Sequence, residues 1–228
     1  MKYDAVIFDL FGTLVDNYVG PAYMEAQARM ASLLGVAQDE LLRVWQGMRL
    51  DRDEGRYGSL EGDIAHLCGL MGIQPEPALV SQVVAAREEG YLRAMKIRPD
   101  SVPTLQRLRS SGHRTALVSD CGFEIPRIWR RTPLAPHFDA TVFSAEARCK
   151  KPDPRMYQLA CDQLGVTPDR CLYVGDGGSR ELTGAKAVGM HPVLIRVEYE
   201  RELDQYRLDA VEWTGPVIYT IEQVLDLV

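Results

Sequence analysis

Residues 3–16 read YDAVIFDLFGTLVD, and this stretch decides the fold that we expect for the chain. It contains an apolar run over residues 5–8, which has the length and composition of a short buried strand. Asp9 ends the run, and Gly12 lies in the turn that follows. Ligands of open parallel sheets bind beyond the carboxyl ends of the strands, so Asp9 is the first candidate site residue.

The same kind of apolar run recurs later in the chain, after residue 99. The later runs cover residues 115–118, 140–143, 171–174 and 192–195, and they alternate with segments of helical periodicity at 101–111, 124–131, 154–164 and 179–188. Strands that alternate with helices form mainly parallel sheets with helices on both faces. We therefore expect an α/β fold with a doubly wound parallel sheet that includes the first strand.

Residues 18–95 follow a different pattern. Apolar positions recur at helical spacing near residues 20–34, 38–50, 60–71 and 77–94, with turn residues between them and no convincing strand. The simplest architecture inserts this stretch between the first and second strands. We predict a core domain formed by residues 1–16 and 97–228 and an inserted helical cap domain formed by residues 17–96.

The composition is that of a globular protein. The 228 residues are 46% hydrophobic, and 26 basic against 32 acidic residues give a formal net charge of −6. This acidic balance argues against nucleic acid or an anionic membrane as a partner. The first apolar run is too short for a signal peptide or a membrane span, so we expect a cytoplasmic protein. The five cysteines contain no CxxC pair, and we expect reduced thiols.

Polar residues follow three of the expected strands. Asp9 follows the first, Ser119 and Asp120 follow the second, and Asp176 follows the strand at 171–174. Each of them alone is more often a turn residue or a helix cap than a site residue. Because the carboxyl ends of parallel strands meet at one edge, the combination predicts a site there.

Three carboxylates in this site would need a compensating charge. If Asp9, Asp176 and Glu181 converge, their repulsion raises their pKa values unless a cation or a basic side chain offsets it. Mg2+ is the simplest answer, because it binds carboxylate and backbone oxygens and leaves positions for a substrate phosphate. The alternative for Glu181 is a favourable interaction with the dipole at the start of a helix.

Lys151 is the basic residue that we expect beside Asp9. It lies between Lys150 and Pro152 just before a helical segment, where a lysine is usually solvated. Beside Asp9, its compact ammonium would balance charge and hold a phosphoryl oxygen. The Ser119 hydroxyl and the turn amides after Phe11 and Asp176 would donate to other oxygens.

Together these residues resemble the four motifs of the haloacid dehalogenase-like hydrolase superfamily. In chain order, the matching residues are DLFGTLVD at 9–16, Ser119 after a strand, Lys151-Pro152, and Gly175-Asp176 with Glu181. The resemblance covers nearly the whole chain. It implies a Rossmann-like core, and the helical insertion between the first two motifs resembles the superfamily's C1-type cap.

The resemblance also implies a reaction and residue roles. Asp9 would be the nucleophile that forms a covalent aspartyl intermediate, and Ser119 and Lys151 would bind and orient the transferring group. Mg2+ would be held by Asp9, the main-chain carbonyl of Phe11 and Asp176, with Glu181 acting directly or through water. The residues expected to contact a small phosphorylated substrate are Gly12, Thr13, Ser119, Asp120 and Lys151.

Phe11 is the main departure from the family's phosphatases. Those enzymes have a second aspartate at this position, which protonates the leaving oxygen and later activates water. Such acid–base assistance is worth roughly 10²- to 10⁴-fold in rate. A milder departure is the last acidic residue, which is Glu181 rather than the usual aspartate.

Phe11 leaves two rival functions open. The superfamily's 2-haloacid dehalogenases also have an aromatic residue there, but they need no metal and lack the Gly-Asp pair, which this chain keeps at Gly175-Asp176. A nearly inactive member that binds a phosphorylated ligand is the second rival. A phosphonatase is disfavoured because it uses a cap lysine, and residues 14–95 contain none.

The helical insertion offers one more candidate element. We expect the loop at residues 50–60, which contains two glycines, to contact the substrate, because loops on a rigid scaffold often carry specificity. The polar and aromatic residues in and beside it are expected mainly on a solvated face; they are Trp45, Arg49, Arg52, Arg56 and Tyr57.

Overall fold

The computed structural model describes residues 2–17 and 20–228, and it contains one parallel sheet. The strands are β1 (Ala5–Phe8), β2 (Arg114–Ser119), β3 (Ala140–Phe143), β4 (Cys171–Gly175), β5 (His191–Ile195) and β6 (Val217–Ile218). Their order is β3-β2-β1-β4-β5-β6, and every neighbouring pair is parallel. The expected α/β, Rossmann-like fold is confirmed.

The helices fall into two groups along the chain. Those between β1 and β2 are α1 (Pro21–Leu34), α2 (Gln38–Gly47), α3 (Arg49–Asp53), α4 (Leu60–Leu70), α5 (Pro77–Ala94) and α6 (Ser101–Ser110). The later ones are α7 (Glu124–Trp129), α8 (Ser144–Ala147), α9 (Pro154–Leu164), α10 (Glu181–Ala187) and α11 (Leu208–Glu212). Short 3-10 helices are η1 (Ala135–His137), η2 (Pro168–Arg170), η3 (Gly178–Arg180), η4 (Glu198–Tyr206) and η5 (Ile221–Asp226).

The alternation of side chains along the strands gives the sheet two buried faces. In β1, Val6 and Phe8 pack with residues of α6, α7 and η5 on one face. Ala5 and Ile7 pack with residues of α9 and α10 on the other. Because both faces are covered, the strands are continuous apolar runs, as the sequence indicated.

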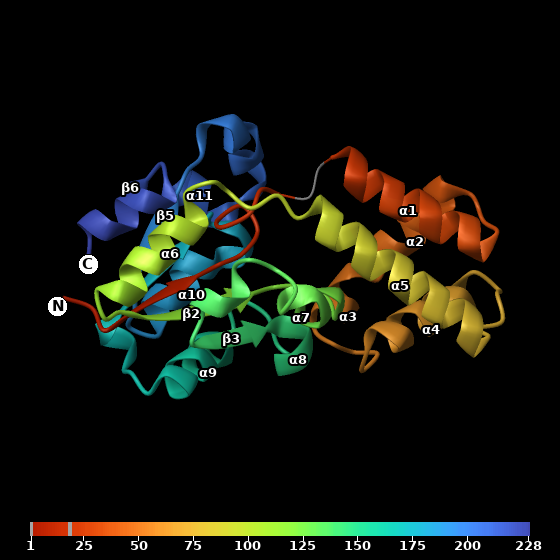
Figure 1. The fold of residues 1–228 in the computed structure, drawn as a ribbon, viewed down its shortest axis with the longest axis horizontal. Helices are drawn as coiled ribbons and strands as arrows, with labels where there is room; N and C mark the ends of the chain where they lie inside the picture. Colours follow the sequence, from red (N-terminus) through yellow and green to blue (C-terminus); the bar gives the residue numbers. More distant parts are fainter. Residues whose placement is uncertain (1, 18–19) are drawn as a thin grey trace.

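Helices α1 to α5 lie at one end of the molecule (Figure 1), where apolar residues of α1, α2, α4 and α5 form a separate cluster. The two linkers that join them to the sheet lie side by side, because Val15 and Ile97 form an antiparallel bridge and Asp16 N donates to Lys96 O (2.9 Å). Both chain ends lie at the opposite end of the molecule. Among the described residues, no helix is long and apolar enough to cross a membrane.

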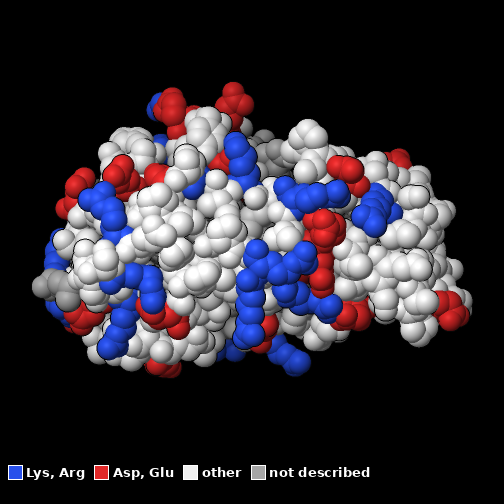
Figure 2. All heavy atoms as spheres, in the orientation of Figure 1, with Lys and Arg blue, Asp and Glu red and all other residues white. Residues whose placement is uncertain are grey.

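Ion pairs join the inserted helices α4 and α5 to α7, which packs on the sheet. Figure 2 shows basic side chains beside acidic ones near the junction. There Arg127 of α7 pairs with Glu61 of α4 (2.6 Å) and Glu88 of α5 (2.5 Å). These contacts fix α4 and α5 against the helix that follows the second strand.

The structure differs from the sequence expectations in three places. The helix expected at 38–50 is divided at Met48 into α2 and α3. Trp45 and Arg52, expected on a solvated face, are 1% and 5% exposed. They are buried because the Arg52 guanidinium stacks on the Trp45 ring at 3.9 Å and pairs with Glu124 of α7 at 3.7 Å. The chain after residue 195, to which no helix or strand was assigned from the sequence, forms η4, α11, β6 and η5.

Candidate active site

Strand register brings three of the expected residues to one edge of the sheet. Phe8, the last residue of β1, is aligned with Leu117 of β2 and Val174 of β4. Asp9, Ser119 and Asp176 follow these positions within two residues, at the carboxyl ends of three adjacent strands. This edge is where open parallel sheets bind their ligands.

Lys151 lies between two of the carboxylates. Its Nζ atom is 2.5 Å from Asp9 Oδ1 and 2.6 Å from Glu181 Oε2. The side chains of all three residues are at most 6% exposed. The predicted neighbourhood of Asp9, Lys151 and Glu181 is therefore present, and Lys151 is not a solvated surface lysine.

Both carboxylate oxygens of Glu181 already accept hydrogen bonds. Oε2 accepts from Lys151 and from the Tyr173 hydroxyl (2.9 Å), and Oε1 accepts from Gly177 N (2.9 Å). The Glu181 main-chain carbonyl accepts from the Tyr157 hydroxyl at 2.9 Å. These hydrogen bonds hold Glu181 next to the turn that carries Asp176.

Asp176 is held over the turn that follows Asp9. Its Oδ1 atom accepts from Gly178 N (2.9 Å), and its Oδ2 atom is 2.7 Å from Nε of Arg207. A Cβ atom at Gly12 would lie only 2.0 Å from Asp176 Oδ2, and Gly12 has a φ of +76°. Only glycine meets both the steric and the backbone requirement at this position.

Two hydroxyls near this edge have no hydrogen-bond partner among the described residues. They are Thr13 Oγ1, in the turn after Asp9, and Ser119 Oγ, at the end of β2, and both are buried. Asp120 Oδ1 accepts from Lys151 N at 2.9 Å, whereas Asp120 Oδ2 has no partner in the described part of the chain. A buried donor without a partner costs about 1–3 kcal/mol, so a ligand oxygen would satisfy Thr13 and Ser119 favourably.

Burial dominates the electrostatics of the site. It raises the pKa of Asp9 to about 6, against the opposing charge of Lys151 and with a further rise from Asp176. Burial also raises the pKa of Glu181 well above its usual range, again against Lys151. The pKa of Lys151 is lowered by burial but raised more strongly by Asp9 and Glu181, so the ammonium keeps its proton.

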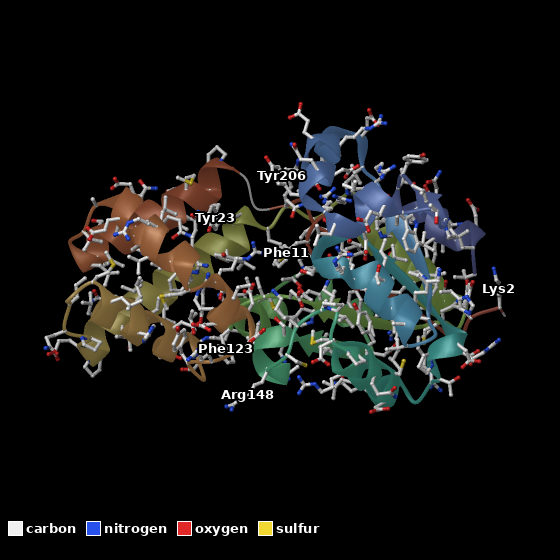
Figure 3. All side chains as sticks on the ribbon, turned by 180° about the vertical axis from the view of Figure 1, so that it is seen from behind. Lys2, Phe11, Tyr23, Phe123, Arg148 and Tyr206 are labelled. Carbon is white, nitrogen blue, oxygen red and sulfur yellow. The ribbon has the colours of Figure 1, made fainter. Side chains whose placement is uncertain are left out.

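Asp9, Asp176 and Glu181 are close enough together to form one cation-binding cluster. Each offers a carboxylate oxygen, and these oxygens lie within 4.8 Å of one another. Phe11 is half-buried in the turn between Asp9 and Gly12 and packs against the apolar cluster on one face of the sheet. Figure 3 shows Phe11 near the junction between the helical end and the sheet.

Arg207, the second cation of the site, was not predicted from the sequence. This residue follows η4, in the part of the chain to which no helix or strand was assigned from the sequence. Tyr173 and Tyr157 were missed because they occur inside an apolar strand and an amphipathic helix, where an aromatic residue is usually only part of the core. In a segment rich in both acidic and basic residues, the sequence does not indicate that one of the arginines has a buried partner.

The loop expected to contact the substrate lies close to the sheet's helices. A Cβ atom at Gly55 would lie 1.9 Å from the carbonyl oxygen of Ala145 in α8, and Gly55 has a φ of +65°. Arg52 NH1 would lie 3.3 Å from a Cβ atom at Gly122, in the segment after Ser119. Residues 50–60 therefore approach the segment that follows β2, while their contact with substrate stays a prediction.

Comparison with known proteins identifies relatives with two kinds of activity. The family model described as haloacid dehalogenase-like hydrolase matches residues 3–189. The chain is 31% identical to (S)-2-haloacid dehalogenase 1 of Pseudomonas sp. (strain CBS-3), over 84% of this chain and 83% of that protein. It is 34% identical to a glyceraldehyde 3-phosphate phosphatase of Methanopyrus kandleri, over 55% of this chain, and it spans only about half (54%) of that relative.

Solved structures share the fold. The crystal structure of a 2-haloacid dehalogenase from Pseudomonas syringae pv. Tomato DC3000 matches with a TM-score of 0.72 and 20% identity. The match covers 99% of this chain and 97% of that chain. This likeness extends over the sheet and the inserted helices together.

Proposed function

The chain belongs to the haloacid dehalogenase-like hydrolases, and on that premise we propose that it is a magnesium-dependent phosphatase of a small phosphorylated metabolite that reacts through Asp9. The observation that carries the proposal is the buried cluster of Asp9, Asp176 and Glu181. A metal-free reaction at Asp9 needs no second carboxylate beside the nucleophile, and leaves Asp176 only its ion pair with Arg207. A divalent cation gives both carboxylates a role.

The proposed reaction has two steps at phosphorus. An Asp9 carboxylate oxygen attacks, the bond from phosphorus to the leaving oxygen breaks, and an aspartyl phosphate forms. Water then attacks the phosphorus, Asp9 leaves as a carboxylate, and inorganic phosphate is released. Lys151 holds Asp9 in its ionised form, and the free hydroxyls of Thr13 and Ser119 suit the phosphoryl oxygens.

The donor set fits Mg2+ in part. Asp9 and Asp176 are hard oxygen donors on adjacent strands, and the main-chain carbonyl of Phe11 lies in the turn beside them. Both oxygens of Glu181 are already engaged, so we propose that Glu181 supports the site through Lys151 and Gly177 N or through water. When bound, Mg2+ would neutralise charge on the transferring phosphoryl group.

Helices α1 to α5 would act as a C1-type cap on this reaction. We place the cap at residues 17–96 and the core at 1–16 and 97–228, with the loop at 50–60 as the element that reads the substrate. The close approach of Gly55 to α8 supports this role.

A 2-haloacid dehalogenase is the second candidate, and Phe11 favours it. A halide leaves without a proton, so a phenyl group in place of the acid–base aspartate costs that reaction nothing. The relative from Pseudomonas sp. carries this activity in its name and matches over most of both chains.

One experiment separates the two functions. Release of phosphate from an activated aryl phosphate and of halide from 2-chloropropionate would be measured with Mg2+ and with excess chelator. The proposal predicts phosphate release that requires Mg2+ and is lost in Asp176→Asn. Halide release that persists in chelator would establish the dehalogenase, and no turnover of either substrate would leave the phospho-ligand-binding alternative.

A further inference from the structure

Arg207 is a second, built-in cation of the carboxylate site. Its Nε atom lies 2.7 Å from Asp176 Oδ2, and its side chain is only 6% exposed. The other guanidinium nitrogens pair with Glu200 Oε2 (2.5 Å) and Asp204 Oδ1 (3.0 Å). The guanidinium is therefore surrounded by three carboxylates, of which one is the carboxylate that the proposed Mg2+ needs.

The charge of the site changes once Arg207 is included. The site then holds two cations, Lys151 and Arg207, against the three carboxylates of Asp9, Glu181 and Asp176. A lysine alone would leave the cluster strongly negative, which is the argument for a bound cation. With Arg207 in place, Asp176 already has a cationic partner, which it shares with Glu200 and Asp204, and the electrostatic attraction for a further cation is reduced.

A divalent ion and the Arg207 guanidinium cannot both bind the Asp176 carboxylate favourably at the same time. Mg2+ binds carboxylate oxygens at about 2.1 Å, so an ion on Oδ2 would lie within about 5 Å of Nε. Two positive groups at this distance repel strongly in a buried site. Asp176 Oδ1 accepts from Gly178 N and keeps a second lone pair, but an ion there would still share one carboxylate with the guanidinium.

We propose that Arg207 is an internal competitor for the divalent cation at Asp176, so that the cation binds well only when the guanidinium leaves Oδ2. This inference rests on the proposed function only for the assignment of a divalent cation to the cluster. It adds a regulatory contact that the family motifs do not contain, since Arg207 lies outside all four.

The backbone near Arg207 is fixed, so the competing movement belongs to its side chain. Asp209 accepts from Thr183 N (2.9 Å) and from the Thr183 hydroxyl (2.6 Å), and Asp209 N donates to Gly177 O (3.0 Å). These bonds tie the start of α11 to the turn that carries Asp176. Rotation of the Arg207 side chain away from Asp176 leaves them intact.

Glu200 connects this side chain to both linkers of the helical insertion. Its carboxylate accepts from Asn17 N (2.9 Å) and Asn17 Nδ2 (3.0 Å), and it pairs with Arg98 (3.2 Å) and with Arg207. Asn17 precedes the inserted helices and Arg98 follows them. Displacement of Arg207 would therefore change the ion pairs that hold the two linkers.

Calorimetric titration with MgCl2 tests the competition directly. Arg207→Met removes the charge and keeps most of the aliphatic chain, and we expect it to bind Mg2+ at least about tenfold more tightly than the wild type. Arg201→Met is the control, because Arg201 pairs with Glu198 (3.5 Å) and not with the three carboxylates that contact Arg207. Its Mg2+ affinity should equal that of the wild type.

The charge-matched double variant Arg207→Met/Glu200→Gln covers the case in which the single variant does not fold. It removes one of the three carboxylates that Arg207→Met would leave without this guanidinium, and the same gain in affinity is expected. Affinity that is unchanged or weaker in the folded variant, or no Mg2+ binding in either protein, would overturn the inference.

The proposed function is tested separately by wild-type phosphate release. Tighter binding in the variant without wild-type phosphatase activity would support the competition and refute the phosphatase. Mg2+-dependent turnover by the wild type without tighter Mg2+ binding in the variant would support the phosphatase and refute the competition.

Discussion

Lys151 is the residue whose replacement should reveal most about the site. In the wild type, its ammonium lies within 2.6 Å of both Asp9 and Glu181, and all three side chains are buried. Lys151→Met keeps the volume of the side chain and removes the charge. Two buried carboxylates are then left close together with no cation between them.

The expected loss of stability is large. Breaking a buried ion pair by removing one partner typically costs about 3–5 kcal/mol. For a chain of this length, each kcal/mol lowers the Tm by about 2–4 °C, so the variant should melt roughly 6–20 °C below the wild type at pH 8.

The loss should depend on pH in a defined direction. The pKa of Asp9 is already raised to about 6 with Lys151 present, and removal of the ammonium raises it further. A carboxyl group whose folded-state pKa exceeds its unfolded value binds protons preferentially in the folded state, so the variant regains stability as the pH falls. The difference from the wild type should be largest at pH 8 and much smaller at pH 5.

Urea unfolding of both proteins at pH 8 and pH 5 measures these differences. Lys150→Met is the matched control, since no ion pair of Lys150 is found in the described part of the chain, and it should change stability by no more than about 0.5 kcal/mol. Glu181→Gln added to Lys151→Met should recover part of the loss. An equal loss at both pH values would refute the charge argument.

Two further predictions concern Asp63 and Phe11. Burial and the charge of Glu124 raise the pKa of Asp63 from 3.8 to about 7, and neither carboxylate oxygen has a partner among the described residues. The free energy of unfolding therefore falls as the pH rises between these two pKa values. Asp63→Asn should stabilise the protein by about 1–3 kcal/mol at pH 8 but not at pH 4, as measured by urea unfolding. An equal effect of the substitution at both pH values would contradict this prediction. If Phe11 leaves the phosphatase without its acid–base group, Phe11→Asp should raise alkyl phosphate turnover at least about tenfold in a steady-state assay and Phe11→Asn should not. A shallow dependence of wild-type rates on leaving-group pKa, with no gain in Phe11→Asp, would mean that another residue supplies the proton.

The sheet could be predicted from the sequence because buried parallel strands are continuous apolar runs. The run at 140–143 coincides with β3, and the helical pattern at 77–94 coincides with α5. The division at Met48 was missed because the apolar periodicity continues through it, although Gly47 directly precedes the break. The two-residue strand β6 is too short to give any pattern.

The proximity of Asp9, Lys151, Asp176 and Glu181 could also be predicted, since each follows a strand or begins a helix at one edge of the sheet. Arg207 could not, because it neither follows a strand nor belongs to a motif, and nothing in the sequence links it to its partner Asp176. Arg52 was placed on a solvated face for the same reason, since its partner Glu124 belongs to a different part of the fold.

Trapping the intermediate on Asp9 tests the central claim most directly. The enzyme would be quenched in acid during turnover of an aryl phosphate with Mg2+, digested, and measured by mass spectrometry. We predict that the peptide carrying Asp9 gains the mass of one phosphoryl group and that Asp9→Asn, which is nearly isosteric, shows neither the adduct nor turnover. Continued phosphate release by Asp9→Asn, or a phosphoryl group on a different residue, would contradict the claim that Asp9 is the nucleophile.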